Sequence, residues 1–524
     1  MEKNTLGYLW REVCDKYSEN QMICDISKSR KCTYGQFYRE VEYLAKGLMG
    51  LGIEKGEHIG LLAENSLEWL KIFAAVTEIG GVLTMFNTSL GREQILSDIN
   101  FSDVTYLFTD RNMIEKLNKR QTSLKDGVSI IEKEEKKIKD IFIIDSDEKS
   151  GYMESICNVI VRDNDLSARK NEIKEENIAT IQFTSGTTGV PKAVQLSHGA
   201  IVKDERRNAA YFSYSTEEKM LLTTPLFHVL GFTACALPIF ICGASLYLLQ
   251  KYSTTKVIET IKKEKCSAIC GVPTIYKFLC NKCRENQVSS LHFALIAGSF
   301  CSIELIQNIF CKLGIKRLEN YYGQSETITI AAASYSPFNS GKEKGFYIMD
   351  GIEYKITDRK HKKILEPGVQ GELAIRSETV MTGYYKNDFV TNKTIQNGWV
   401  YTGDIAVADS TGKIYIKGRM RDTIIRGGEN ISAMEVEEQI RCYPMVKAVT
   451  VTGIPDAVYG QEVCAFIIPK EKQSFTIEDL AAYLWNKKGY KIPKYIYFVD
   501  KFPCTVSGKI QKYKLVQNYI KKEE

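Results

Sequence analysis

Apolar runs that predict buried strands alternate with helical patterns through the first third of the chain. Thr33 is placed to cap a helix over 34–50, and Ser66 is placed to cap a helix that begins at "LEWLKIFAAVTEI". The segments "HIGLLAEN" and "VLTMFN" flank the second helix and are short and apolar enough to be buried strands. Such alternation is typical of an α/β fold with parallel strands.

The pattern changes twice further along the chain. A charged segment over 116–139 separates the strands "VTYLFTD" and "IKDIFIID", and we expect it to form surface loop and helix without a binding role. From 351 onward the sequence consists of short strands with turn signals, such as "EYKITD", "GELAIRS" and "GKIYIKG". A new unit begins after "GRMRD", so we predict an N-terminal domain over 1–420 and a C-terminal domain over 421–524.

One apolar stretch, over 221–250, is long enough to cross a bilayer, and it carries no Asp, Glu, Lys or Arg. Two prolines and two glycines interrupt it, however, and its end, "ASLYLL", has the character of a strand. We therefore predict a buried helix and strand here rather than a membrane span.

Composition places the chain among soluble globular proteins of more than one domain. Its 524 residues exceed one ordinary core, and 44% are hydrophobic and 26% charged. The first residues lack the apolar core of a signal peptide, and fifteen cysteines suit a reducing compartment, so we expect a cytoplasmic protein. The net charge is +6, and residues 470–524 hold twelve lysines against six acidic residues. That basic end could face a phosphate-bearing partner or simply be a solvated surface.

The segment 184–192 reads "TSGTTGVPK" and combines glycines, hydroxyls and one lysine. Glycines let backbone N–H groups approach an anion, hydroxyls add donors, and lysine supplies a positive charge, so the composition suits phosphate. It is not a Walker A loop, because Pro191 precedes Lys192 and Ala193 follows it. Taken alone, the segment could also be an ordinary turn between strands.

Four further motifs accompany it in a characteristic order: "NYYGQSET" at 320–327, "YTGD" at 401–404, "GRMRDTIIRGGEN" at 418–430 and "VSGKIQK" at 506–512. With these motifs the sequence closely resembles the adenylate-forming superfamily, which includes acyl-CoA synthetases, aryl-CoA ligases, luciferases and the adenylation domains of peptide synthetases. The resemblance covers nearly the full length.

The resemblance implies both a fold and a reaction. The fold is α/β, with a large N-terminal domain of layered mixed β-sheets, flanking helices and a small β-barrel-like subdomain, followed by a small mobile α+β C-terminal domain. In the reaction, a carboxylate attacks the α-phosphate of ATP and releases pyrophosphate, and a thiol then displaces AMP from the acyl adenylate. ATP, Mg²⁺ and coenzyme A are the implied cofactors.

The resemblance assigns roles to the residues of the first two motifs. The first would hold the β- and γ-phosphates through Thr184, Ser185, Gly186, Thr187, Thr188, Gly189 and Lys192. In the second, Asn320 would meet the adenine edge, Tyr322 would stack on the ring beside Gly323, Ser325 would reach the α-phosphate and Glu326 would bind Mg²⁺. Thr184 is a second candidate for the metal, and Gly298 and Ser299 are further candidates for the nucleotide site.

The remaining motifs supply the ribose, catalytic and hinge residues. Asp404 would accept from the ribose hydroxyls, with Arg419 close to ribose or phosphate. Lys509 is the expected catalytic lysine, which draws the carboxylate and the α-phosphate together. The hinge is expected at Arg421, where relatives carry Asp or Lys, and the approach to coenzyme A at Gly427, Gly428 and Glu429.

The choice of acid is expected to depend on an apolar pocket, which would include Phe227, His228, Val229, Gly298 and Phe300. No carboxylate stands there to pair an ammonium, so amino acids are excluded. We predict a medium or longer fatty acid, with an aryl acid as the alternative. Coenzyme A is the expected thiol, although an acyl carrier protein would also suit the basic C-terminal segment.

Other interpretations stay open. The chain could be a nucleotide-binding relative that no longer catalyses, although the retained Glu326, Asp404 and Lys509 argue against it. We expect neither a nucleic-acid partner nor a transmembrane span, and a monomer or a homodimer. Four cysteines have spacings that could hold zinc, but the buried strand and helix predicted around them favour structural thiols: Cys266, Cys270, Cys280 and Cys283.

Overall fold

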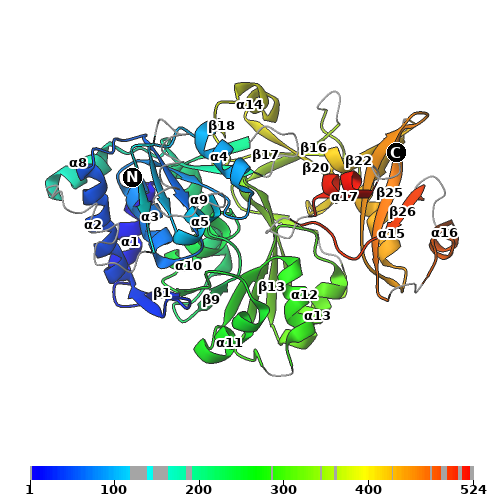
Figure 1. Cartoon of the computed structure of the whole chain (residues 1–524), viewed down its shortest axis with the longest axis horizontal. Coiled ribbons are helices and arrows are strands. Elements are labelled where there is room, and N and C mark those ends of the chain that lie inside the picture. The colour runs from blue at the N-terminus through cyan, green and yellow to red at the C-terminus, as the bar shows by residue number, and fades with distance from the viewer. Residues whose placement is uncertain are drawn as a thin grey trace. The chain divides into compact units, whose positions relative to one another are not determined.

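The computed structural model describes residues 3–117, 138–145, 163–184, 192–284, 287–342, 345–358, 363–427, 429–471, 475–485, 492–504 and 510–519 (Figure 1). The chain divides into two compact units. Unit 1 comprises 1–344, 349–352 and 376–400, and unit 2 comprises 345–348, 353–375 and 401–524. The domain boundary predicted between 420 and 421 lies inside unit 2 and stays a prediction.

Unit 1 is built on two sheets. In the first, neighbouring strands run in the order β14 (Ile328–Tyr335), β13 (Arg317–Gln324), β12 (Phe293–Ile296), β11 (Ala268–Gly271), β9 (Lys219–Leu222), β10 (Ser245–Leu248), β1 (Gln21–Asp25) and β2 (Arg30–Thr33). All neighbours from β13 to β1 are parallel, and the two outer pairs are antiparallel.

The second sheet has the order β18 (Gly383–Tyr384), β8 (Lys192–Ser197), β7 (Ile178–Thr184), β4 (Val82–Met85), β3 (His58–Leu62), β5 (Tyr106–Thr109) and β6 (Asp140–Ile143). Its pairs from β7 to β6 are parallel, while β8 pairs antiparallel with both of its neighbours. The mixed α/β class predicted from the alternating pattern is confirmed.

The helices of unit 1 connect and cover these strands (Figure 1). They are α1 (Leu6–Lys16), α2 (Tyr34–Gly50), α3 (Leu67–Glu78), α4 (Arg92–Phe101), α5 (Arg111–Leu117), α8 (Asp163–Glu172), α9 (His198–Phe212), α10 (Leu237–Ile241), α11 (Thr254–Glu264), α12 (Pro273–Lys282), α13 (Ile303–Leu313) and α14 (Asp388–Thr394). A π-helical turn η1 (Phe232–Ala236), a 3₁₀ turn η2 (Pro337–Asn339) and the short strand β19 (Ile395–Gln396) complete the unit.

The two helix caps predicted from the sequence are confirmed. Thr33 accepts from the backbone N–H of Gln36 in a complete capping box, and the Ser66 hydroxyl accepts from the N–H of Trp69. The helix that follows Ser66, α3, is buried on every face. Its charged residues are therefore paired, since Lys71 Nζ lies 2.7 Å from both Glu40 and Glu68.

The apolar stretch 221–250 is divided among several short buried elements. It begins in β9, passes through η1 and α10, and ends in β10. The helical part spans only 232–241, so the predicted buried helix and strand are confirmed. Within the described ranges, no helix has both the length and the apolar character that crossing a bilayer requires.

Unit 2 contains a part built from β-strands and a C-terminal α+β part. In the first, β16 (Glu353–Thr357), β17 (Gly371–Arg376), β20 (Trp399–Ala408) and β21 (Ile414–Arg419) follow one another, and β15 (Tyr347–Ile348) precedes them in the chain. In the second, β23 (Glu429–Ser432), β22 (Thr423–Arg426), β25 (Gly460–Pro469) and β24 (Val446–Asp456) are neighbours, and β26 (Tyr495–Phe498) also pairs with β25.

The C-terminal sheet of unit 2 has its own apolar core. That core packs strands β22 to β26 against α15 (Ala433–Arg441) and α16 (Ile477–Trp485). The turn η3 (Met420–Asp422) leads into this sheet, and α17 (Lys512–Tyr519) is the last described helix. The small α+β C-terminal part expected from the family resemblance is therefore present.

Candidate active site

The phosphate-binding segment predicted at 184–192 joins two antiparallel strands, β7 and β8. Its first and last residues, Thr184 and Lys192, face each other, and the Thr184 hydroxyl donates to the Lys192 carbonyl at 3.3 Å. Because β7 runs parallel to β4, the segment leaves the carboxyl edge of a parallel sheet, where α/β folds place ligands. Five of the predicted residues lie outside the described ranges: Ser185, Gly186, Thr187, Thr188 and Gly189.

The β13–β14 hairpin carries the second motif. Asn320 and Tyr322 lie on one face of β13, with Asn320 buried and Tyr322 half-buried, while Ser325 and Glu326 lie in the turn. At Gly323 a Cβ atom would stand 1.9 Å from the carbonyl oxygen of Ile328, so only glycine fits. Ile328 has φ +53°, a left-handed conformation that is rare for a β-branched residue. The turn that presents Glu326 is thus tightly constrained.

Tyr384, which was not predicted from the sequence, contacts one residue of each of these two motifs. Its hydroxyl donates to Glu326 Oε1 at 2.8 Å, and Lys192 Nζ lies 5.1 Å from the centroid of its ring. Burial, followed by the charge of Glu326, raises the pKa of the Tyr384 phenol, so it remains a donor at neutral pH. Signals for this residue in the sequence were weak, since "GYY" reads as a short strand or a turn.

The residues predicted to form the acid pocket lie at the carboxyl edge of the first sheet. Phe227, His228 and Val229 follow β9, and Gly298 to Phe300 follow β12. Since β9, β11, β12 and β13 are parallel neighbours, these segments leave the sheet at the same edge as the second motif. Gly298 has φ +89°, and Phe300 is 44% exposed.

His228 and Asn65 both have defined partners near that edge. The His228 Nδ1 atom accepts from the N–H of Leu230 at 3.2 Å, which fixes the ring locally. The buried Asn65, which follows β3, donates to the Thr224 carbonyl and accepts from the N–H of Leu226. Asn65 therefore links the carboxyl edge of the second sheet to the segment that leads into the pocket.

In unit 2, Asp404 and Arg419 are direct partners across β20 and β21. Arg419 Nε lies 3.0 Å from Asp404 Oδ1, and Asp404 is only 2% exposed. The preceding Gly403 has φ +68°, and the Asp404 N–H donates to the Thr402 hydroxyl at 3.1 Å. Strands β20 and β21 thus hold the carboxyl group of Asp404 beside a guanidinium, a pair suited to a polar ligand such as ribose.

The predicted hinge and coenzyme A residues lie further along unit 2. Arg421 is exposed in η3, with Nε 3.9 Å from Asp422 Oδ1. Gly427 has φ +57° and donates its N–H to the Tyr459 carbonyl, and Glu429 is exposed at the start of β23. Gly428 and the predicted catalytic residue Lys509 lie outside the described ranges.

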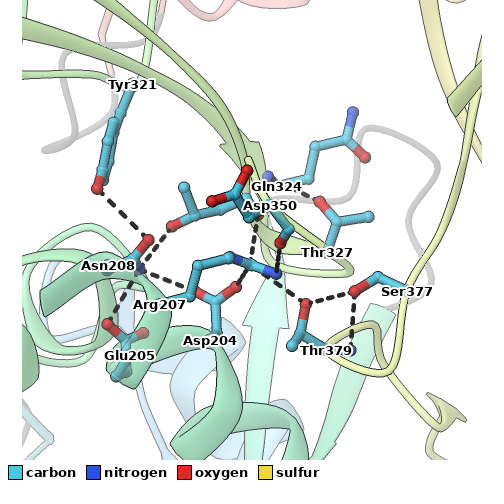
Figure 2. A network of polar contacts seen from close by, with 11 residues as sticks. Asp204, Glu205, Arg207, Asn208, Tyr321, Gln324, Thr327, Asp350, Ser377 and Thr379 are labelled. Carbon is cyan, nitrogen blue, oxygen red and sulfur yellow. Dashed lines mark hydrogen bonds and ion pairs between the residues drawn. The ribbon is translucent and has the colours of Figure 1, made fainter. Parts of the chain in front are cut away.

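A buried polar network on α9 supports the β13–β14 hairpin from beneath (Figure 2). Asp204 pairs with Arg207, which also donates to the carbonyls of Thr329 and Asp350 and to the Thr379 hydroxyl. Burial raises the pKa of Asp204 to about 6. One arginine therefore ties α9, β14 and the segment before β18 together.

Asn208 extends the same network along α9. Its amide donates to Asp204, Glu205 and the Thr329 hydroxyl, and its oxygen accepts from the Tyr321 hydroxyl at 3.4 Å. Burial, and next the charge of Asp204, raises the pKa of Glu205 well above its ordinary value, which favours the neutral form of this acid. Figure 2 shows these side chains converging under the hairpin.

The four cysteines considered as zinc ligands lie in or next to a buried strand and a helix. Cys266 is buried just before β11, Cys270 is buried in β11, Cys280 is buried in α12 and Cys283 directly follows α12. Burial raises the thiol pKa of Cys266 to about 12 and of Cys280 to about 11, which favours thiols over metal-binding thiolates. Among the described residues, no three His, Cys, Asp or Glu side chains are grouped to hold a metal ion.

Comparison with known proteins identifies the family. The model of the AMP-binding enzyme family matches residues 10–385, and the model of the AMP-binding enzyme C-terminal domain matches 435–509. The "Putative acyl-CoA synthetase YngI" of Bacillus subtilis is 34% identical over 99% of this chain and 97% of that protein. The mitochondrial medium-chain acyl-CoA ligase of Danio rerio is 28% identical over 98% of this chain and 88% of the relative.

Solved structures agree on the fold. The ATP-bound crystal structure of MatB from Rhodopseudomonas palustris has a TM-score of 0.87 at 21% identity, and it covers 99% of this chain and 100% of that one. The o-succinylbenzoate CoA synthetase of Bacillus subtilis, in complex with its acyl-adenylate intermediate, has a TM-score of 0.80 at 23% identity over 97% of both chains. The chain belongs to the AMP-binding enzyme family, and within it to the acyl-CoA synthetases, the AMP-forming acid–thiol ligases.

Proposed function

We propose that this ligase activates a medium-chain or longer fatty acid as its acyl adenylate and transfers the acyl group to coenzyme A, with release of AMP and pyrophosphate. The observation that carries the proposal is the end-to-end similarity to relatives named as acyl-CoA synthetases and medium-chain acyl-CoA ligases. ATP, Mg²⁺ and coenzyme A are the corresponding cofactors of this family.

The proposed nucleotide site of unit 1 uses two hairpins, β7–β8 and β13–β14. Thr184, Lys192 and the residues between them would hold the β- and γ-phosphates, and Ser325 would contact the α-phosphate. Glu326 suits Mg²⁺, because its carboxylate is half-buried and has lone pairs beyond the one that Tyr384 engages. A bound Mg²⁺ would neutralise charge on the phosphates.

Four side chains are proposed to recognise adenine and ribose. Asn320 offers an amide to the adenine edge, and Tyr322 offers a flat ring. Asp404 offers carboxyl oxygens as acceptors for the ribose hydroxyls, beside the guanidinium of Arg419. We propose that Lys509 supplies the mobile positive charge for the first step, and that Arg421 is the hinge before the thioester-forming step.

The residues of the predicted acid pocket favour an apolar acid as the substrate. Phe227 and Val229 belong to the segment "PLFHVLGF", which contains no carboxylate to pair with an ammonium group, so an amino acid would lose the hydration of its charge. Phe300, after β12, is the candidate to limit the length of the acyl chain. An aryl acid is the alternative that the same pocket allows.

The thiol, the compartment and the assembly are also part of the proposal. Coenzyme A is favoured as the thiol, and a carrier protein is the alternative. We propose that the enzyme works in the cytoplasm, since fourteen cysteines are free thiols in the described structure. It would act there as a monomer or a homodimer.

A panel of acids tests the proposed substrate and thiol together. Purified enzyme receives ATP, Mg²⁺, coenzyme A and one acid at a time, from butyrate to palmitate and including benzoate and o-succinylbenzoate. AMP and the acyl-CoA product are then measured by mass spectrometry. We expect the highest kcat/KM with saturated acids of medium length or longer. A preference for an aryl acid would overturn the substrate, and AMP formation without any CoA thioester would overturn the thiol.

A further inference from the structure

Tyr384 contacts both hairpins of the proposed phosphate and metal site, and no role has been given to it above. It is 4% exposed, its hydroxyl lies 2.8 Å from Glu326 Oε1, and the face of its ring lies 5.1 Å from Lys192 Nζ. One buried side chain thus reaches the candidate metal ligand with its polar end and the candidate phosphate ligand with its ring.

Backbone hydrogen bonds fix both ends of the Tyr384–Glu326 contact. Tyr384 pairs with Val194 in the β18–β8 ladder, and its N–H donates to the Thr391 hydroxyl at 2.9 Å. On the other side, the Glu326 carbonyl accepts from the N–H of Met381 at 2.8 Å. The hydroxyl therefore meets the carboxylate from a position that the sheet defines.

A carboxylate in a turn can adopt several rotamers, and a hydrogen bond to one oxygen removes most of this freedom. Residues that orient a metal ligand in this way commonly govern metal affinity as strongly as some ligands do. The ring adds a cation–π contact, which favours one position of the Lys192 ammonium.

We propose that Tyr384 is a positioning residue, which holds the Glu326 carboxylate for Mg²⁺ through its hydroxyl and the Lys192 ammonium for the phosphates through its ring. This inference rests on the proposed function, because it assumes that Glu326 and Lys192 serve the metal and the nucleotide.

Metal binding provides a test that does not depend on turnover. Tyr384→Phe keeps the ring and removes the hydroxyl. The affinity for Mn²⁺, a paramagnetic substitute for Mg²⁺, is measured by electron paramagnetic resonance in the presence of α,β-methylene ATP, which the adenylation step cannot cleave. We expect Y384F to weaken Mn²⁺ binding by about 10- to 100-fold. An affinity equal to that of the wild type would overturn the proposal.

The neighbouring residue is a matched control. Tyr385 also donates its hydroxyl to a carboxylate, Asp103 Oδ2, at 2.8 Å. Tyr385→Phe therefore removes the same kind of bond at the adjacent position, away from Glu326. We expect it to leave Mn²⁺ affinity within about twofold of the wild-type value, and an equal loss in Y385F and Y384F would contradict a specific role of Tyr384.

A double-mutant cycle separates positioning from general destabilisation. If Tyr384 acts through Glu326, the double variant Y384F/E326Q should bind Mn²⁺ no more weakly than Glu326→Gln alone. Additive losses would overturn the proposal. Tyr384→Leu also removes the ring, and we expect it to weaken binding of the ATP analogue several-fold beyond Y384F; equal affinities would exclude the role of the ring.

Different results would overturn the proposed function and the proposed role of Tyr384. A wild-type enzyme that forms no acyl adenylate from any acid would overturn the proposed function, whatever the metal affinity of the variants. A normal wild-type enzyme with unchanged metal affinity in Y384F would overturn the role of Tyr384 alone.

Discussion

Asp404 and Arg419 face each other across β20 and β21, with Arg419 Nε 3.0 Å from Asp404 Oδ1. The two residues are fifteen positions apart in the sequence, and the antiparallel register makes them direct neighbours. Asp404 is buried beside this guanidinium, and its carboxyl oxygens can accept hydrogen bonds, which is what binding to ribose hydroxyls requires.

Asp404→Ala should raise the KM for ATP by about tenfold or more, because hydrogen bonds to a charged group are lost. The sharper readout compares ATP with 2′-deoxy-ATP. We expect the wild type to prefer ATP and D404A to lose that preference. Asp409→Asn, in the nearby β20–β21 turn, is the control and should keep the preference. An unchanged preference in D404A would show that Asp404 does not contact the 2′-hydroxyl.

The raised pKa of Glu205 predicts a pH-dependent gain in stability for Glu205→Gln. The pKa of Glu205 is raised in the folded protein, whereas the unfolded chain ionises this acid above about pH 4.5, so folding takes up a proton between the unfolded and folded pKa values. The contribution of Glu205 to the free energy of unfolding of the wild type therefore becomes less favourable by about 1.4 kcal/mol per pH unit above 4.5. This decrease ends when the pH reaches the pKa of Glu205 in the folded protein.

Glutamine mimics the neutral acid and avoids this cost. Chemical denaturation should show E205Q gaining stability over the wild type between pH 5 and pH 7. Glu93→Gln, an exposed position in α4, is the control and should change little at either pH. A constant difference between E205Q and the wild type across this range would mean that Glu205 is ionised in the folded protein.

Arg207→Met should destabilise unit 1 by about 3–5 kcal/mol, because it leaves Asp204 buried without its cation. The double variant R207M/D204N should recover part of the loss, since no buried charge is then unpaired. Arg206→Met is the matched control, because that neighbouring arginine pairs with the exposed Glu12 and should cost less than about 1 kcal/mol. A double variant less stable than R207M would contradict the pairing.

Lys509→Ala should suppress formation of the acyl adenylate far more than transfer from a supplied acyl adenylate to coenzyme A. The lysine is proposed to stabilise charge only in the first step. Measuring the two half-reactions separately checks this. Lys514→Ala, at an exposed position in α17, is the control and should leave both rates near the wild-type values. Equal losses in the two half-reactions of K509A would exclude the role.

Much of the fold follows from local patterns. The caps at Thr33 and Ser66 have short-range chemical causes, and the interrupted run at 221–250 was recognisable from its Pro and Gly residues. The parallel order of the strands then brings Phe227, Phe300 and Asn320 to one edge, although Phe227 and Asn320 are 93 positions apart in the sequence.

What the sequence could not predict depends on contacts between distant segments. Tyr384 meets Glu326 across 58 residues, and Arg207 meets Thr379 across 172, so no local periodicity signals either contact. The left-handed φ of Ile328 also contradicts local preference, since glycine or asparagine would be expected there. Packing of the hairpin against α9 and the segment before β18 outweighs that preference.

Acid-dependent exchange of labelled pyrophosphate into ATP tests the central claim most directly, because it requires a reversible attack of the carboxylate on the α-phosphate. With Mg²⁺ and medium-chain or longer fatty acids, and without coenzyme A, we expect label to enter ATP in the wild type and far more slowly in K509A. Absence of exchange by the purified wild-type protein with every acid of a broad panel would contradict the account.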